Sequence, residues 1–191
     1  MGVRVGVVAV AVVLAVAGCS GGDAPPPSAL PSDSAPPQSS SPPSNPPSTA
    51  ATPPTPPPLP ATATQDTPAG AASFARYYIE VLDYASHTGD VRALRRLGDC
   101  GTCRAQANGI ERFFKEGGRV EGGEIHITGT EAVRFRRTAA LVNVTYDQAA
   151  GKSTSGEGRA ESSPALKSEI FALTLRQLND SWSVQKMQTL R

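Results

Sequence analysis

Apolar residues at helical spacing predict a long helix near the middle of the chain. Thr67 and Pro68 supply an N-cap hydroxyl and a first-turn proline, which are typical of a helix start. Gly89 is a natural helix stop. The apolar positions that share one face of this helix are Phe74, Tyr78, Val81, Leu82 and Ala85. Two further helices are expected, one from Asp90 to near Gly98 and one from about Cys103 to Glu116.

Beyond residue 118 the period of the apolar positions changes from about 3.6 to about 2, which is typical of strands. Four strands are expected, at residues 124–128, 140–146 and 170–178 and from Trp182 onward. The Gly- and Ser-rich stretch from Ala149 to Pro164 is expected to be a hairpin loop. Three helices followed by about four antiparallel strands predict an α+β domain over residues 66–191.

The segment before this domain has a different composition. Sixteen of the 18 prolines lie between Pro25 and Pro60, among Ser, Ala and Thr and with almost no charge. Such a segment buries too little apolar surface to offset the entropy of ordering. We therefore expect residues 19–65 to be a disordered, proline-rich tether.

The first 18 residues have the pattern of an export signal. Arg4 precedes an apolar run of 13 residues from Val5 to Ala17, which is too short to span a membrane. Residues 16–19, Val-Ala-Gly-Cys, resemble a bacterial lipobox. The resemblance implies cleavage before Cys19 and a diacylglycerol on its thiol, and two acyl chains suffice for stable anchoring.

The order of elements in residues 66–191 resembles the nuclear-transport-factor-2-like cone fold. This resemblance implies one bent antiparallel sheet of about four strands, packed on the three N-terminal helices, with a pocket at the open end. In ketosteroid-isomerase relatives of that fold a tyrosine and acids in the pocket act in catalysis. No acid of this chain matches such a site, so no catalytic residue is carried over.

A second resemblance is to an actinobacterial lipoprotein family, domain of unknown function 6318. The shared features are the lipobox, the proline-rich stalk, the helix start Gly70-Ala71-Ala72-Ser73-Phe74, the junction Thr88-Gly89-Asp90 and the Cys-x-x-Cys motif. This family has no assigned activity, so the resemblance implies a cellular location but no catalysed reaction.

Cys100 and Cys103 form the most specific motif of the domain. Outside the membrane, a Cys pair at this spacing is expected to be a structural disulfide between the second and third helices. A redox-active pair is the alternative, since a thiolate at a helix start has a lowered pKa. Zinc is disfavoured because two further ligands at suitable spacing are missing.

Four residues are candidates to line a pocket: Tyr78, Tyr84, His126 and Trp182. Phe113 and Phe114 belong to the same aromatic set, although aromatic residues at helical spacing more often form plain core. Without an identifiable acidic partner, His126 is not assigned a catalytic role.

Charge adds little to this assignment. The chain has a net charge of +1, and residues 66–191 hold 17 basic and 15 acidic residues, too small an excess to indicate a nucleic-acid partner. Arg134, Arg136 and Arg137 form a small basic cluster at a strand end, where contact with anionic headgroups or wall polymers is an alternative to simple solvation.

These observations predict a lipoprotein on the extracytoplasmic face of the cell membrane, held in the bilayer by acylated Cys19. Its domain is expected to be a non-enzymatic binding or accessory module without cofactor or metal. The partners considered are a cell-wall component, a small apolar ligand and a membrane protein. The alternatives are a small pocket enzyme (an isomerase or hydrolase) using Tyr78 or His126, and a thiol-disulfide protein.

The lipobox generates a direct test. Replacing Cys19 by Ala removes the thiol that carries the lipid, so Cys19→Ala is expected to move the protein from the membrane fraction to the medium or to leave an uncleaved precursor. Cell fractionation and immunoblotting measure this. A Cys19→Ala protein that is still processed and still membrane-bound would contradict the prediction.

Overall fold

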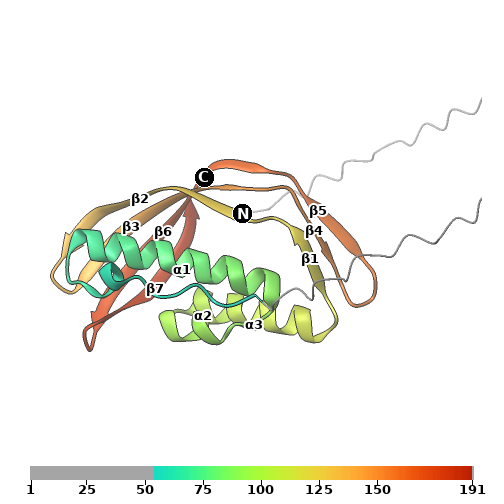
Figure 1. Cartoon of the computed structure of the whole chain (residues 1–191), viewed down its shortest axis with the longest axis horizontal. Coiled ribbons are helices and arrows are strands. Elements are labelled where there is room, and N and C mark those ends of the chain that lie inside the picture. The colour runs from blue at the N-terminus through green and yellow to red at the C-terminus, as the bar shows by residue number, and fades with distance from the viewer. Residues whose placement is uncertain (1–53, 191) are drawn as a thin grey trace, which may run out of the picture. The chain divides into compact units, whose positions relative to one another are not determined.

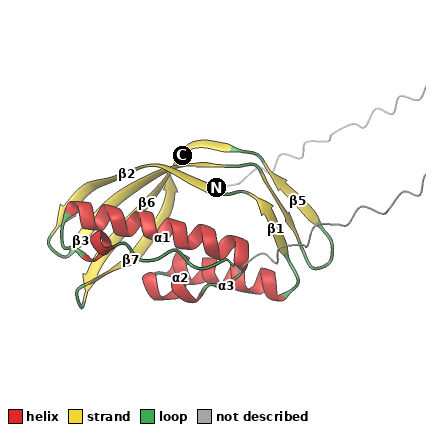
Figure 2. Cartoon of the chain, in the orientation of Figure 1, coloured by secondary structure: helices red, strands yellow, loops and turns green. Residues whose placement is uncertain are grey.

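The computed structural model of the protein describes residues 54–190 (Figures 1 and 2). The export signal, Cys19 and the tether up to residue 53 lie outside the described residues. The elements are η1 (Ala61–Thr64), α1 (Pro68–Thr88), α2 (Arg92–Leu97), α3 (Gly101–Lys115), β1 (Arg119–Gly122), β2 (Ile125–Arg136), β3 (Ala139–Gln148), β4 (Gly151–Thr154), β5 (Ala160–Ser163), β6 (Leu166–Leu178) and β7 (Ser181–Leu190).

Helix α1 begins and ends where its sequence predicts. The Thr67 hydroxyl accepts a hydrogen bond from the backbone N–H of Gly70 at 2.9 Å, and Pro68 occupies the first helical position. At the other end, Gly89 has a φ of 75° and donates its N–H to the carbonyl of Ala85. Both ends of α1 are therefore set by local side-chain and backbone chemistry.

The fold-class prediction is wrong. It expected an α+β domain in which three helices pack on one bent sheet of about four strands. The described residues instead hold more strand than helix, in two antiparallel sheets preceded by three α-helices. One sheet has four strands in the order β2-β3-β6-β7, and the other has three in the order β1-β4-β5. The resemblance to the cone fold relied on a single sheet and is not carried further.

The second sheet arises because the extended chain is interrupted at three places, between β1 and β2, between β3 and β4 and between β5 and β6. Each strand of the smaller sheet continues into a strand of the larger one: β1 into β2, β3 into β4 and β5 into β6 (Figure 1). At the first break Gly122 and Gly123 have φ values of 66° and 83°, which end the extended path. At the third, Pro164 has no N–H for a ladder bond. The stretch from 149 to 164, expected to be a loop, forms the β4–β5 hairpin.

Helix α1 lies across one face of the four-stranded sheet (Figure 1). The core lies between them, because the alternating strands turn one apolar face toward the helix. On α1, Tyr78 and Val81 are fully buried and Phe74 and Leu82 are nearly so. They belong to one hydrophobic cluster with Val142, Val144, Leu173, Leu175, Trp182 and Val184. No helix within residues 54–190 combines the length and apolar character needed to cross a membrane.

Residues 54–65, which we call the strap, lie against the domain although their composition predicted tether. Ala63 is 1% exposed. The indole N–H of Trp182 donates to the carbonyl of Gln65 at 3.0 Å, and the Tyr84 hydroxyl donates to the carbonyl of Pro54 at 3.3 Å. The packed part of the chain therefore begins at least twelve residues before position 66.

Tyr78 tests how the core is filled. Its side chain is fully buried, its hydroxyl has no hydrogen-bond partner within the described residues, and burial raises its pKa to about 12. Tyr78→Ala is expected to cost about 3–5 kcal/mol of unfolding free energy, because it leaves a cavity. Tyr78→Phe removes only the unpaired hydroxyl, so it is expected to keep or increase stability, by up to about 1–3 kcal/mol. Urea unfolding measures both. A clearly destabilised Tyr78→Phe protein would show that the hydroxyl has a partner.

Candidate functional site

An apolar hollow lies between α3, the end of α1 and the three-stranded sheet. Its volume is about 330 Å³. The residues that line it are Ser86, Gly109, Ile110, Phe113, Phe114, Val120 and Ser153. Four elements, α1, α3, β1 and β4, therefore meet around one space, and most of the side chains facing it are apolar.

The second half of α3 supplies the apolar wall. Only Cys103 and Ala107 of this helix are buried, whereas Ile110, Phe113 and Phe114 are only half-buried. The rings of Phe113 and Phe114 meet edge to face, with centroids 5.5 Å apart. A Cβ on Gly89 would come within 2.7 Å of the Phe114 ring, so the end of α1 has to be glycine for this ring to lie against it.

A second hollow, of about 200 Å³, adjoins the first and is more polar. The two share Ser86, Val120 and Ser153. The residues found only in the second are His87, Gly122, Gly123, Gln148, Gly151, Lys152, Glu161 and Ser163. We call the two hollows together the cleft. It has an apolar end at α3 and a polar end at the break between the two sheets.

His87 joins the end of α1 to the sheet break at the polar end of the cleft. Its Nδ1 lies 2.8 Å from the carbonyl oxygen of Asp83, and its Nε2 lies 3.0 Å from the carbonyl oxygen of Gly122. Carbonyl oxygens only accept, so the ring satisfies both contacts only when both nitrogens carry a proton. The Asp83 carboxylate is 3.5 Å from Nδ1 and accepts the N–H of Ile125 at 3.0 Å. The site therefore favours the imidazolium form.

The pKa values of the pair reflect competing effects. Burial alone lowers the pKa of His87, but the two carbonyl hydrogen bonds and the charges of Asp83 and Glu124 outweigh burial and raise this pKa above its usual value. Burial raises the pKa of Asp83, and the Ile125 hydrogen bond and the His87 charge oppose that rise.

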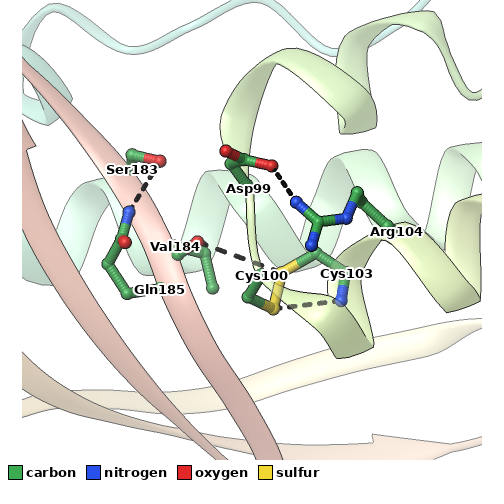
Figure 3. Close-up of a disulfide and its surroundings, with 7 residues drawn as sticks. All are labelled: Asp99, Cys100, Cys103, Arg104, Ser183, Val184 and Gln185. Carbon is green, nitrogen blue, oxygen red and sulfur yellow. Dashed lines mark hydrogen bonds and ion pairs between the residues drawn. A yellow bond between two sulfur atoms is a disulfide. The ribbon is translucent and has the colours of Figure 1, made fainter.

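Cys100 and Cys103 are joined by a disulfide away from the cleft (Figure 3). They are 7% and 2% exposed. The N–H of Cys103 donates to the sulfur of Cys100 at 3.0 Å, and the sulfur of Cys103 lies 4.0 Å from the carbonyl oxygen of Val184 on β7. Thiol exchange needs an accessible sulfur, so this burial argues for a structural staple at the start of α3.

The structure does not bring the four predicted pocket residues together. Tyr78 lies in the core, and Trp182 is buried beneath the strap. Tyr84 is half-buried and holds the strap at Pro54. His126 is exposed on β2, opposite Asp147 of β3. None of the four lines the cleft.

The cleft was only partly visible in the sequence. Phe113 and Phe114 belong to the aromatic set singled out there, and both line it. The sequence did not indicate Ser86, Val120 or Ser153, because only the β1–β4 pairing brings Val120 opposite Ser153. His87 carried a weak signal as a histidine in the last turn of a predicted helix.

Within residues 54–190, no polar or charged residue is buried, and no group of three or more His, Cys, Asp or Glu residues is arranged to hold a metal ion. The polar groups of the cleft are thus half-buried side chains bonded to the backbone, such as His87 and Gln148, and exposed ones, such as Lys152 and Glu161, beside an apolar wall. This arrangement suits binding of an amphipathic molecule.

The chain matches one family model and resembles a number of solved structures. A family model described as "Family of unknown function (DUF6318)" matches residues 39–188. None of the curated proteins matches the chain. The intermembrane space region of chloroplast protein ARC6 is 11% identical, with a TM-score of 0.47 over 65% of this chain and 96% of that one.

Two other solved structures are less similar. A SEC-C motif containing protein from Rhodopseudomonas palustris is 10% identical, with a TM-score of 0.36 over 60% of this chain and 77% of that one. A putative aromatic ring hydroxylase from Novosphingobium aromaticivorans is 14% identical, with a TM-score of 0.31 over 64% of this chain and 78% of that one. At these TM-scores the three structures carry no argument about this protein.

The His87 contacts predict a pH dependence. A folded-state pKa above the unfolded value near 6.5 stabilises the protein below about pH 6.5, and this stabilisation is lost as pH rises through the folded pKa. The raised pKa of Asp83 acts in the same direction at lower pH. The melting temperature of the wild type should therefore exceed that of His87→Gln near pH 5, and the difference should shrink as pH rises to about 8.

The exposed His126 provides the control, since His126→Gln removes a histidine outside these contacts. The stability of His126→Gln is expected to fall with rising pH as that of the wild type does. His87→Gln is expected to lack this fall in stability between about pH 5 and pH 8. Parallel curves for the wild type and His87→Gln would contradict the charged bridge.

Proposed function

The chain belongs to DUF6318, a family of unknown function, and on this premise we propose that it is an extracytoplasmic lipoprotein whose domain binds a small amphipathic molecule. The proposal has two parts, an anchor and a binding cleft. They depend on different residues and are tested separately.

The observation that supports binding is the cleft. Small-molecule sites are mostly apolar hollows of about 300 Å³ or more with a few polar groups that orient the ligand. The apolar end of the cleft has a volume of about 330 Å³. Covering the half-buried Ile110, Phe113 and Phe114 of α3 with a ligand lowers the free energy by about 25 cal/mol for each Å² of apolar surface removed from water.

The polar end restricts the kind of ligand. Lys152 and Glu161 are exposed there, and Gln148 uses its amide N–H₂ to bond the carbonyl of Gly123 at 3.1 Å. Both ring nitrogens of His87 are engaged by carbonyl oxygens. A ligand with an apolar body and one polar group therefore fits better than a wholly polar one, and a wall or membrane constituent of that kind is the partner we favour.

The anchor in this proposal is a lipid on Cys19. Its support is the sequence: a short apolar run that ends in a lipobox-like Val-Ala-Gly-Cys, followed by a proline-rich segment. These features favour the extracytoplasmic face of the cell membrane, with the bilayer as the first partner and a cell-wall component or membrane protein as the second. The net charge of the domain, with 17 basic and 15 acidic residues in 66–191, gives no reason to propose a nucleic-acid partner.

The enzymatic alternatives have less support. Tyr78 is sealed in the core, and His126 is exposed on β2 and does not line the cleft. The sulfurs of Cys100 and Cys103 are buried. A binding role needs only the apolar wall, whereas these reactions need groups that substrate can reach.

Gly109 allows a sharp test of the cleft. It lines the apolar end, and a Cβ built on it meets no atom within 4 Å. Gly109→Leu is expected to fill this space, while its higher helix propensity favours α3 by about 0.8 kcal/mol. Binding of an anilinonaphthalene sulfonate probe, followed by fluorescence titration, should weaken about tenfold or more, equivalent to at least about 1.4 kcal/mol, without a lower melting temperature.

Two control variants separate filling from other effects. Gly109→Ala gives the same gain in helix propensity but leaves most of the space, so it should bind the probe nearly as the wild type does. Gly101→Leu adds the same side chain at the first residue of α3, where a Cβ also meets open space outside the cleft. Unchanged probe binding by Gly109→Leu would refute the cleft as the binding site.

A further inference from the structure

The outer face of the four-stranded sheet carries a cluster of basic residues that the strands assemble from three parts of the sequence. Residues directly opposite each other in an antiparallel pair share one face of the sheet. One row across the sheet holds Arg136, Ala139, Arg176 and Ser183, and the next holds Arg134, Leu141, Thr174 and Lys186. Arg137 lies in the turn that joins β2 and β3. We call Arg134, Arg136, Arg137, Arg176 and Lys186 the basic face.

The alternation of burial supports this placement. Ala140 and Val142 on β3 and Leu173 and Leu175 on β6 point into the core. The residues between them face outward, and all five side chains of the basic face are exposed. With strands about 4.8 Å apart, the rows from β2 to β7 span roughly 14 Å.

The basic face carries a concentrated positive charge that no acidic side chain in its two rows neutralises. The ion pairs found within residues 54–190 all involve other side chains. Glu131 begins the next row, but neither of the two basic rows contains an acid. Residues 66–191 hold 17 basic and 15 acidic residues, so outside the basic face twelve basic residues are outnumbered by fifteen acidic ones. The small net charge of the domain therefore hides a strong asymmetry.

The basic face also contains a hollow of about 160 Å³. Arg134 and Arg136 lie on its rim, and the small or apolar residues Ala139, Leu141 and Thr174 contribute to its lining. Guanidinium groups bind phosphate oxygens in a planar, two-pronged way, and their weak hydration favours interfaces. A cationic rim around an apolar floor fits a phospholipid headgroup better than a fully hydrated phosphate polymer.

We infer that the basic face docks the domain on an anionic phospholipid surface. The choice of a membrane as the occupant rests on the proposed lipid anchor at Cys19, which would hold the domain near the bilayer. Each basic residue close to an anionic membrane contributes about fivefold in affinity, so several together give binding that salt weakens.

The test uses the unlipidated chain from Ser20 to Arg191, which contains every described residue. Its binding is measured by co-sedimentation with vesicles of phosphatidylglycerol and phosphatidylcholine in equal parts, and with vesicles of phosphatidylcholine alone. Binding to the anionic vesicles only, reduced at high salt, is expected. The variant Arg134→Gln/Arg136→Gln/Arg176→Gln should bind about 100-fold more weakly, and melting curves should verify its fold.

A matched variant removes the same charge elsewhere. Arg112, Arg119 and Arg159 are exposed on α3, on β1 and in the β4–β5 hairpin. Arg112→Gln/Arg119→Gln/Arg159→Gln is expected to bind within about threefold of the wild type, because most of the attraction comes from charges held at the surface.

Three results would overturn the inference. They are equal losses in both triple variants, equal binding to neutral vesicles, and binding to soluble polyphosphate without binding to vesicles. The third would assign the basic face to a phosphate polymer. Because the chain in this test carries no lipid, failure here would leave the Cys19 anchor untouched, and failure of the Cys19 fractionation test would leave vesicle binding to stand by itself.

Discussion

The burial of α1 on nearly all sides is the constraint on which the rest of the structure depends. Tyr77, Tyr78 and Ile79 are consecutive, so their side chains point about 100° apart around the helix, and all three are buried. A single sheet covers only one stripe of a helix. The four-stranded sheet, helices α2 and α3, and the strap each cover part of α1. The strap is therefore part of the fold, because Ala63 belongs to the buried core, and Pro56 and Pro57 line a hollow together with Tyr77.

The cleft exists because only the first half of α3 packs closely against the rest of the domain. The start of α3 is held by the Cys100–Cys103 disulfide and by the burial of Cys103 and Ala107. Its second half extends past the end of α1, where Gly89 leaves room for the Phe114 ring. No described element covers Ile110 and Phe113 fully. The three-stranded sheet faces them across the cleft, because the sheet break at Gly122 separates it from the larger sheet. A well-packed first half and an open second half thus occur on one helix.

Features set by neighbouring residues, such as helix ends, could be predicted from the sequence. Features that depend on pairing between distant strands, such as the second sheet, could not. Thr67 and Gly89 act on neighbouring residues, so both ends of α1 could be predicted. The division into two sheets depends on breaks that line up only after β1, β4 and β5 have paired, so Gly122 gave no usable signal by itself. The same holds for the sites. Phe113 stood out as an aromatic residue but resembled plain core, and Arg176 joins the arginines of β2 only through the register of β3 and β6.

The strap also determines how the domain bears mechanical load. Its contacts run from Gln65, beside Trp182, to Pro54, beside Tyr84 near the far end of α1. Along the chain from Pro54, tension meets the Tyr84 hydrogen bond first and the buried Ala63 later. A pull on the chain ahead of Pro54 thus reaches the outer part of the strap before it reaches the core residues Ala63 and Trp182.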